Sequence, residues 1–182
     1  MKAFTPILAA AALAAAGFST AANAATATGN LQVKITITKE CQVNSGSGGA
    51  GAGDAVLDFG SRGVLNANVD GQTATSGTGA IQVQCTNGTA YQIGLNAGLN
   101  PSSPGDINTR RMKNGTEFVS YQLYQDSART TVWGNTTGAS GNTVSKTADG
   151  TVQGTQVFGR VPPQTTPSAG VYSDTVTITV TY

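Results

Sequence analysis

The sequence contains no histidine, only two cysteines, and charged residues at only 10% of its 182 positions. Without histidine, neither a Ser-His-Asp nor a Cys-His catalytic arrangement can form. Histidine is also the commonest metal ligand in proteins, so its absence removes the usual basis of a transition-metal site. We therefore expect that the protein is not an enzyme, has no cofactor and has no small-molecule substrate.

Positive charge is scarce as well. The chain has ten basic and nine acidic residues, and loss of Lys2 with a leader peptide would make the two counts equal. Nucleic acids and anionic membrane surfaces bind proteins through clusters of Lys and Arg, so neither is an expected partner. A neutral, polar surface suits contact with other protein surfaces.

A long hydrophobic run is absent after residue 24, and the N-terminal apolar run is short. Lys2 precedes an Ala/Leu-rich stretch that ends in the small-residue pattern Ala22–Ala24. This order is typical of a secretory signal peptide over residues 1–24, cleaved after Ala24. A membrane anchor is the alternative, but the run consists of weakly hydrophobic Ala and is interrupted by Gly, Ser and Thr.

The two cysteines, Cys41 and Cys85, are expected to form one disulfide after export to an oxidising compartment. A metal-binding or redox pair is the alternative interpretation. Its CxxC spacing is absent, and the chain has no histidine to complete a metal site.

Apolar residues alternate with period two along nearly the whole chain, and no helical periodicity follows the leader. The sequence therefore predicts an all-β fold, and its short strands separated by turn signals predict a β-sandwich. Asn87-Gly88 is expected to form a tight turn. The expected strands are Leu31–Thr38, Ala55–Phe59, Ala80–Cys85, Tyr91–Asn96, Phe118–Gln125, Thr143–Lys146, Thr151–Arg160 and Val171–Tyr182.

The tract 45–53 is rich in Gly and Ser, which is typical of a flexible loop. Gly46, Gly48 and Gly51 match the GxGxxG spacing of dinucleotide-binding loops. That motif requires a preceding strand and a following helix, which are not expected here, so we interpret the tract as a loop.

The two ends of the mature chain carry matched strand patterns. Leu31, Val33, Ile35 and Ile37 alternate with polar residues, and Val176, Ile178, Val180 and Tyr182 alternate with threonines. The sequence ends on Tyr182, so we expect the last strand to have an edge without a partner. An uncovered edge invites association, and two solutions are open: the N-terminal strand folds back on its own domain, or a neighbouring copy supplies it.

Two further groups of residues have alternative interpretations. Asp54, Asp58 and Asp70 could suggest calcium, but EF-hand spacing is absent and Asp is common in turns. Tyr121, Tyr124 and Trp133 could form a binding patch. Tyr121 and Tyr124 cannot share one face of a strand, and we expect Trp133 to pack in the core.

Three separated segments resemble one protein family. They are VQCTNGTAYQIGLNAG (83–98), VSYQLYQDSARTTVWG (119–134) and VFGRVPPQTTPSAGVYSDTVTITVTY (157–182), and LDFG (57–60) fits as well. They resemble the spore coat protein U family, which includes the archaic, Csu-type chaperone–usher pilins. The resemblance implies an incomplete immunoglobulin-like β-sandwich that lacks its final strand and is completed by a strand from the next subunit.

The resemblance also implies roles for individual residues. Residues 25–39 would form a donor-strand extension and residues 40–182 the pilin domain. The donor side chains would be Leu31, Val33, Ile35 and Ile37, and Cys41 and Cys85 would form a disulfide at the start of the domain. Val176, Ile178 and Val180 would line the acceptor groove, and Tyr182 would end that C-terminal strand.

The expected function is therefore a structural pilus subunit that polymerises by donor-strand exchange into surface fibres for adhesion and biofilm formation. The resemblance implies other copies of the chain, a periplasmic chaperone and an outer-membrane usher as partners. A monomeric, self-complemented coat protein is the main alternative. A tip adhesin is less expected because such proteins usually carry an extra receptor domain.

Overall fold

The structure, a computed structural model, describes residues 25–43 and 54–182. The expected signal peptide and the tract 45–53 with its GxGxxG spacing lie outside these residues. The chain divides into two units, Met1–Thr36 and Ile37–Tyr182, each with its own internal contacts.

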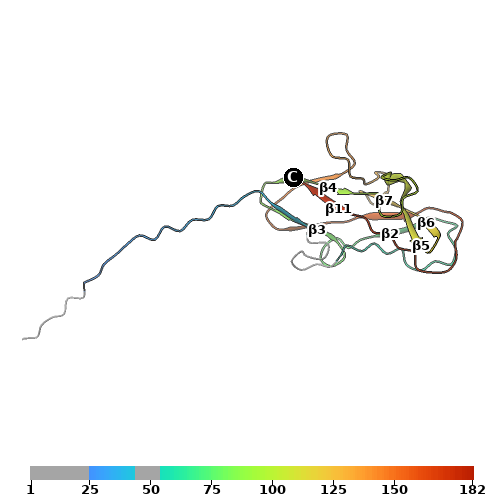
Figure 1. The fold of residues 1–182 in the computed structure, drawn as a ribbon, viewed down its shortest axis with the longest axis horizontal. Helices are drawn as coiled ribbons and strands as arrows, with labels where there is room; N and C mark the ends of the chain where they lie inside the picture. The colour runs from blue at the N-terminus through green and yellow to red at the C-terminus, as the bar shows by residue number, and fades with distance from the viewer. Residues whose placement is uncertain (1–24, 44–53) are drawn as a thin grey trace, which may run out of the picture. The chain divides into compact units, whose positions relative to one another are not determined.

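Over its described residues, 37–43 and 54–182, the second unit is all β apart from one short 3-10 helix, and its strand pairs there are antiparallel (Figure 1). The elements of the described residues are β1 (Cys41–Val43), β2 (Val69–Gln72), β3 (Ile81–Cys85), β4 (Ala90–Leu95), η1 (Ile107–Thr109), β5 (Arg111–Asn114), β6 (Glu117–Ser120), β7 (Gln122–Tyr124), β8 (Val144–Thr147), β9 (Val152–Thr155), β10 (Phe158–Val161) and β11 (Ile178–Thr181). They form sheets ordered β1-β3-β9, β2-β10-β7, β11-β4-β8 and β5-β6.

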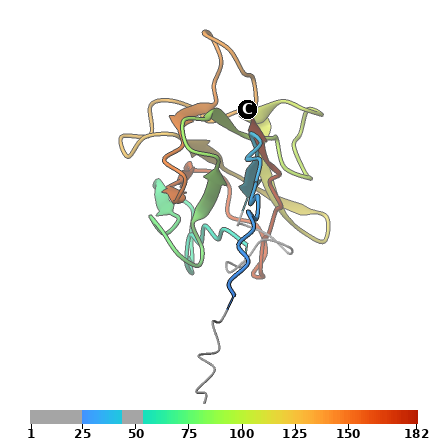
Figure 2. The same cartoon turned by 90° about the vertical axis from the view of Figure 1, so that its left-hand side faces the viewer.

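One apolar core is shared by these sheets, whose strands surround it in Figure 2. Its centre consists of alternate residues of β3 and β4 together with Trp133, whose side chain is fully buried. Trp133 donates its indole N–H to the carbonyl of Ile93 over 2.8 Å, which satisfies its one polar group. The expected core position of Trp133 is confirmed, as is the predicted all-β class.

The described part of the first unit, residues 25–36, has no regular secondary structure and is exposed throughout. No strand forms over the predicted range Leu31–Thr38, although its alternating pattern is clear. A β-strand exists only through hydrogen bonds to a neighbouring strand, and this segment has no such ladder in the single chain. The strand prediction is therefore wrong for the isolated chain.

Two other predicted strands are each divided in the structure. The range Phe118–Gln125 breaks at Tyr121, so β6 pairs with β5 whereas β7 pairs with β10. The range Thr151–Arg160 breaks likewise into β9, which pairs with β3, and β10, which pairs with β2. Strands that pass from one sheet to another need such breaks, which period-two patterning does not reveal.

The remaining differences concern the edges of the domain. The range Ala55–Phe59 is extended but belongs to no sheet, and Val171–Tyr182 shortens to β11. The sequence pattern does not predict β2, because Asp and Gly are rare in strands. Gly71 is required there: a Cβ atom would lie 3.0 Å from the side chains of Leu57 and Phe59, which cross over β2.

Arg110 is the most unusual residue of the interior, because its side chain is completely buried without a carboxylate partner. Its guanidinium donates to the carbonyls of Leu95, Asn96 and Trp133 and to the side-chain oxygen of Gln122. Burial lowers the pKa of the guanidinium to about 10, which leaves it charged at neutral pH. One side chain thus joins the end of β4, the segment at Trp133 and β7.

The predicted disulfide is present between Cys41 and Cys85, which face each other in the β1–β3 pair. It closes a loop with a sequence separation of 44 residues. The crosslink therefore fixes the first residues of the domain to β3, a strand with neighbours on both sides.

Replacing Arg110 with Met should lower the free energy of unfolding by about 3 kcal/mol or more, because several buried acceptors lose their donors at once. Urea denaturation of a dilute sample, in which the chain is monomeric, measures this change. Exposed Arg62 is the matched control, and Arg62→Met should change stability by less than about 0.5 kcal/mol. Equal effects of the two variants would contradict the assigned role of Arg110.

Replacing both Cys41 and Cys85 with Ser should lower the free energy of unfolding by about 4 kcal/mol, the loop-closure entropy for this separation. Denaturant titration with and without a reductant provides the measurement. The reductant should destabilise the wild type and leave the double variant unchanged.

Candidate functional site

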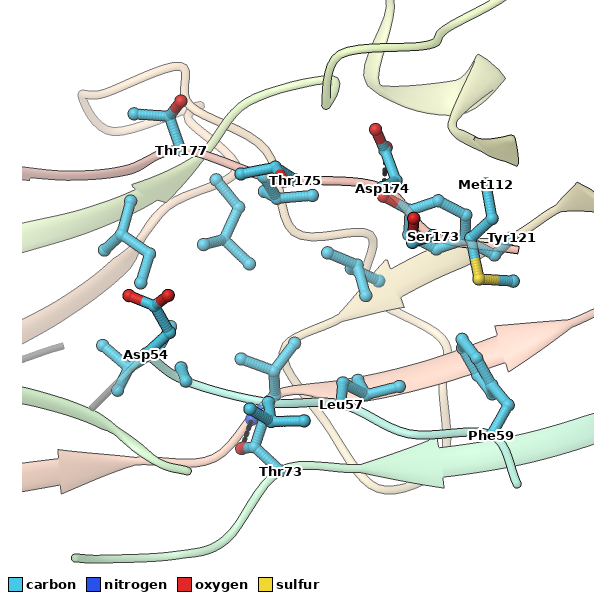
Figure 3. A pocket seen from close by; sticks show the side chains of 18 of the residues that line it. Asp54, Leu57, Phe59, Thr73, Met112, Tyr121, Ser173, Asp174, Thr175 and Thr177 are labelled. Carbon is cyan, nitrogen blue, oxygen red and sulfur yellow. Dashed lines mark hydrogen bonds between the residues drawn. The ribbon is translucent and has the colours of Figure 1, made fainter. Parts of the chain in front are cut away.

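An open, mostly apolar groove of about 640 Å³ runs along one side of the domain (Figure 3). One side is formed by residues 54–59, here called the first wall, and the opposite side by residues 172–178, the second wall. Figure 3 places Asp54 and Thr177 at one end, and Phe59, Ser173 and Tyr121 at the other. The two walls therefore run antiparallel, and buried side chains from the core, among them Ile81, Leu95, Leu123 and Val157, form the floor.

Both walls have the burial pattern of strands whose inner face is only partly covered. In the first wall, Ala55, Leu57 and Phe59 are half-buried and the residues between them are exposed. The second wall repeats this pattern from Tyr172 through Ile178. The inward side chains pack against the core yet remain accessible, so the groove can gain further apolar contact.

The second wall also presents a free backbone edge. Among the described residues, β11 pairs with β4 alone. Thr177 directs both backbone groups away from the groove: its carbonyl accepts from the Asn96 N–H and its N–H donates to Asn96 Oδ1. Because backbone groups alternate in direction along a strand, those of Val176, Ile178 and Val180 point toward the groove. They can hydrogen-bond an added strand.

The end of the groove near Phe59 is polar. Asp174 accepts hydrogen bonds from the Tyr121 hydroxyl over 2.7 Å, from the Leu99 N–H over 2.9 Å and from the Asn100 side chain over 3.0 Å. Burial raises the pKa of the Tyr121 phenol, and the hydrogen bond to Asp174 raises it further. The network fixes the second wall to the segment that follows β4.

The predicted acceptor residues occupy different positions relative to the groove. Val176 and Ile178 line it. Val180 is half-buried against the core beyond the groove end, opposite Ile93 in the β11–β4 pair. The Tyr182 ring is 51% exposed, and the Lys39 ammonium lies 5.9 Å from its centre.

The predicted donor residues are among the most exposed large apolar side chains of the protein. Leu31, Val33, Ile35 and Ile37 have exposed fractions of 86%, 86%, 81% and 70%. Exposure of so many aliphatic side chains to water in one short segment is unfavourable, and this makes the segment a candidate binding surface.

The sequence pattern does not assign the first wall, Tyr121 or Asp174 to the groove. The alternation of Ala55, Leu57 and Phe59 is a detectable signal, but by itself it predicts an ordinary strand. Asp174 gave no such signal, because its role depends on Leu99 and Tyr121, which are distant in sequence.

Other candidate residues have structural roles. Asp70 forms ion pairs with Arg160 over 2.7 Å and with Arg129 over 3.4 Å. Over residues 25–43 and 54–182, no group of three or more Asp, Glu, Cys or His side chains is placed to hold a metal ion. The same ranges contain no helix with the length and hydrophobicity needed to cross a bilayer.

Replacing Tyr121 with Phe should reduce stability by about 1–3 kcal/mol near pH 8, because the half-buried Asp174 carboxylate loses a donor. This deficit should shrink as the pH rises above 10, the ordinary pKa of tyrosine. Above this pH, unfolding of the wild type releases the Tyr121 proton, which lowers the free energy of unfolding of the wild type by about 1.4 kcal/mol per pH unit. The Tyr121→Phe variant has no such proton to release. Urea denaturation between pH 8 and 11 checks this, and a constant deficit would contradict it.

Known proteins resemble this chain in sequence and in fold. The family model of the Spore Coat Protein U domain matches residues 27–179. Protein U of Myxococcus xanthus is 36% identical over 134 residues, which are 71% of this chain and 73% of that protein. A similar solved structure is the CsuC–CsuE chaperone–tip adhesion subunit pre-assembly complex from the archaic chaperone–usher Csu pili of Acinetobacter baumannii. Its matched chain has 24% identity and a TM-score of 0.52, which shows a shared fold, and the match covers 81% of this chain but only 41% of that one. From the family match, this chain belongs to the Spore Coat Protein U domain family.

Proposed function

We propose that the protein is a structural subunit of a surface pilus, in which the N-terminal segment of one copy fills the groove of the next. One observation carries this proposal: the domain has an open apolar groove with a free strand edge, and the same chain carries an exposed segment with the pattern of the strand that would fill it.

The groove and the segment are complementary in period and in chemistry. A strand added beside β11 would place alternate side chains on the floor, where Ile81, Leu95 and Leu123 already form an apolar surface. Leu31, Val33, Ile35 and Ile37 provide four such side chains, each worth about 1.5–3 kcal/mol when fully buried. The backbone hydrogen bonds of the new strand help to offset the conformational entropy that the segment loses when it becomes ordered, which costs about 1–2 kcal/mol per residue.

The connection to the domain favours a neighbouring copy over self-insertion. Lys39 lies beside Tyr182, close to the C-terminal end of β11. Only one residue separates Ile37 from Lys39, and this connection spans at most about 7 Å. The chain's own segment could then enter the groove only with Ile37 nearest Tyr182, which makes it parallel to β11. A second copy's segment has no such restraint and can insert antiparallel, the pairing that is slightly more stable per residue.

The family match and the solved neighbour support the proposed partners. The neighbour is a chaperone–subunit pre-assembly complex of a chaperone–usher pilus, and by analogy we include a periplasmic chaperone and an outer-membrane usher. In this proposal residues 1–24 are a signal peptide cleaved after Ala24, residues 25–39 the donor extension and residues 40–182 the pilin domain. The fibre would lie on the cell surface and serve adhesion and biofilm formation.

A self-complemented, monomeric coat protein is the second candidate. The observation that supports it is the match of residues 27–179 to the Spore Coat Protein U domain, whose description names a coat protein. The two candidates differ in one measurable property. A self-closed domain stays monomeric at every concentration, whereas a donor-strand subunit purified without its chaperone assembles.

Replacing Val33 or Ile35 with Asp should abolish assembly, because each variant would place an unpaired carboxylate on the apolar floor at a cost of roughly 3–5 kcal/mol. Size-exclusion chromatography and gel electrophoresis of unboiled samples measure the polymer. Gln32→Asp is the matched control, since it adds the same charge to the polar face of the segment.

Polymer should persist in Gln32→Asp and disappear in Val33→Asp, while all variants are exported with the Cys41–Cys85 disulfide formed. Polymer in every variant, or a wild type that remains monomeric, would overturn the proposed donor role.

A further inference from the structure

The groove is lined by two carboxylates and no cation. Asp174, at one end, is satisfied by Tyr121, Leu99 and Asn100. Asp54, at the opposite end, is exposed, and within the described ranges no Lys or Arg lies within ion-pair distance of it. Asp54 is therefore a negative charge at the groove without a counter-ion.

The N-terminal segment carries the complementary charge. Lys34 is the only charged residue between positions 25 and 38. It is exposed and belongs to the polar face of the segment, between Val33 and Ile35. An inserted strand that buries its apolar face would hold Lys34 at the open surface of the groove, level with the exposed residues of both walls.

The direction of the backbone groups limits how such a strand can pair. Odd-numbered residues of the second wall direct their backbone groups away from the groove: Thr177 bonds to Asn96 after β4, and Ser173 bonds to Lys113 of β5. A strand added on the groove side therefore meets Thr175, Thr177 and Thr179 at non-hydrogen-bonded positions, where paired Cα atoms lie about 4.5 Å apart. Thr177 and Asp54 lie at the same end of the groove (Figure 3).

We propose, resting on the function proposed above, that Lys34 of an incoming second copy lies opposite Thr177 and pairs with Asp54, which fixes the register of antiparallel insertion. In this register Leu31 lies opposite Val180, Val33 opposite Ile178, Ile35 opposite Val176 and Ile37 opposite Asp174. Threonines also meet on the outer face, where Thr36 lies opposite Thr175.

Shape alone does not choose this register. A shift of two residues keeps the aliphatic side chains on the inward side of the strand, since side chains alternate with period two. A shift in either direction moves Lys34 about 7 Å along the groove, away from Asp54. The charge pair therefore distinguishes registers that apolar packing treats alike.

Disulfide trapping in the full chain tests the register. Thr36→Cys combined with Thr175→Cys should give reducible cross-links between subunits, because a non-hydrogen-bonded pair brings the two Cα atoms within disulfide range. Thr36→Cys with Ser173→Cys, and Thr36→Cys with Thr177→Cys, report the two shifted registers and should give little cross-linked product. All three pairs leave Lys34 and Asp54 intact.

Charge reversal tests the pair itself. In the Thr36/Thr175 cysteine background, Asp54→Lys should lower the cross-link yield about threefold, the size expected of a cross-strand charge pair. Adding Lys34→Glu should restore it. The matched control is Asp58→Lys, which reverses an exposed charge of the first wall that does not line the groove, and it should leave the yield unchanged.

The outcomes separate this inference from the proposed function. Polymer with dominant cross-linking through Ser173 or Thr177, polymer without any of the three cross-links, or an unchanged yield in Asp54→Lys overturns the register while donor-strand exchange stands. If the chain without any introduced cysteine remains monomeric, both the proposed register and donor-strand exchange are overturned.

Discussion

A strand at the edge of a sheet must have its backbone hydrogen-bonding groups either solvated or paired, and in this protein that constraint falls on β11. Its odd-numbered residues are satisfied by β4 and the segments next to it, whereas its even-numbered residues direct their backbone groups to the groove. The first wall lies across that groove, held over Gly71 and Gly159, where side chains larger than hydrogen would collide with Leu57 and Phe59. The gap between the walls is therefore maintained by the packing of the domain.

Arg110 and the disulfide stabilise a domain in which one sheet edge is unpaired. The guanidinium donates to carbonyl groups of two segments, the end of β4, which supports β11, and the segment at Trp133, and to the side chain of Gln122 in β7. Buried charges are usually paired with an opposite charge, and here hydrogen bonds to neutral acceptors replace the partner. The Cys41–Cys85 bond secures the opposite end, where the exposed segment joins the domain.

Much of this architecture was predictable from the sequence, for identifiable physical reasons. Period-two alternation revealed the all-β class, and the strands around Val83, Ile93 and Val180 are where the pattern placed them. The pattern failed at Tyr121 and between Thr155 and Phe158, because a strand that changes sheets keeps its alternation. The pattern did not reveal β2, because Asp70 forms an ion pair and Gly71 allows close packing at positions where a strand pattern needs apolar residues. Arg110 and Asp174 could not be assigned, since their partners are brought together only by the fold.

The disulfide also determines how the chain would bear mechanical load. In a fibre joined by inserted segments, tension on one subunit enters through Ile37 and reaches the domain at Cys41. Without the crosslink, that pull would act on the hydrogen bonds between the three residues of β1 and β3. With it, the force passes directly into β3, which is braced by β1 on one side and β9 on the other. The covalent bond thus carries the load past the short strand β1.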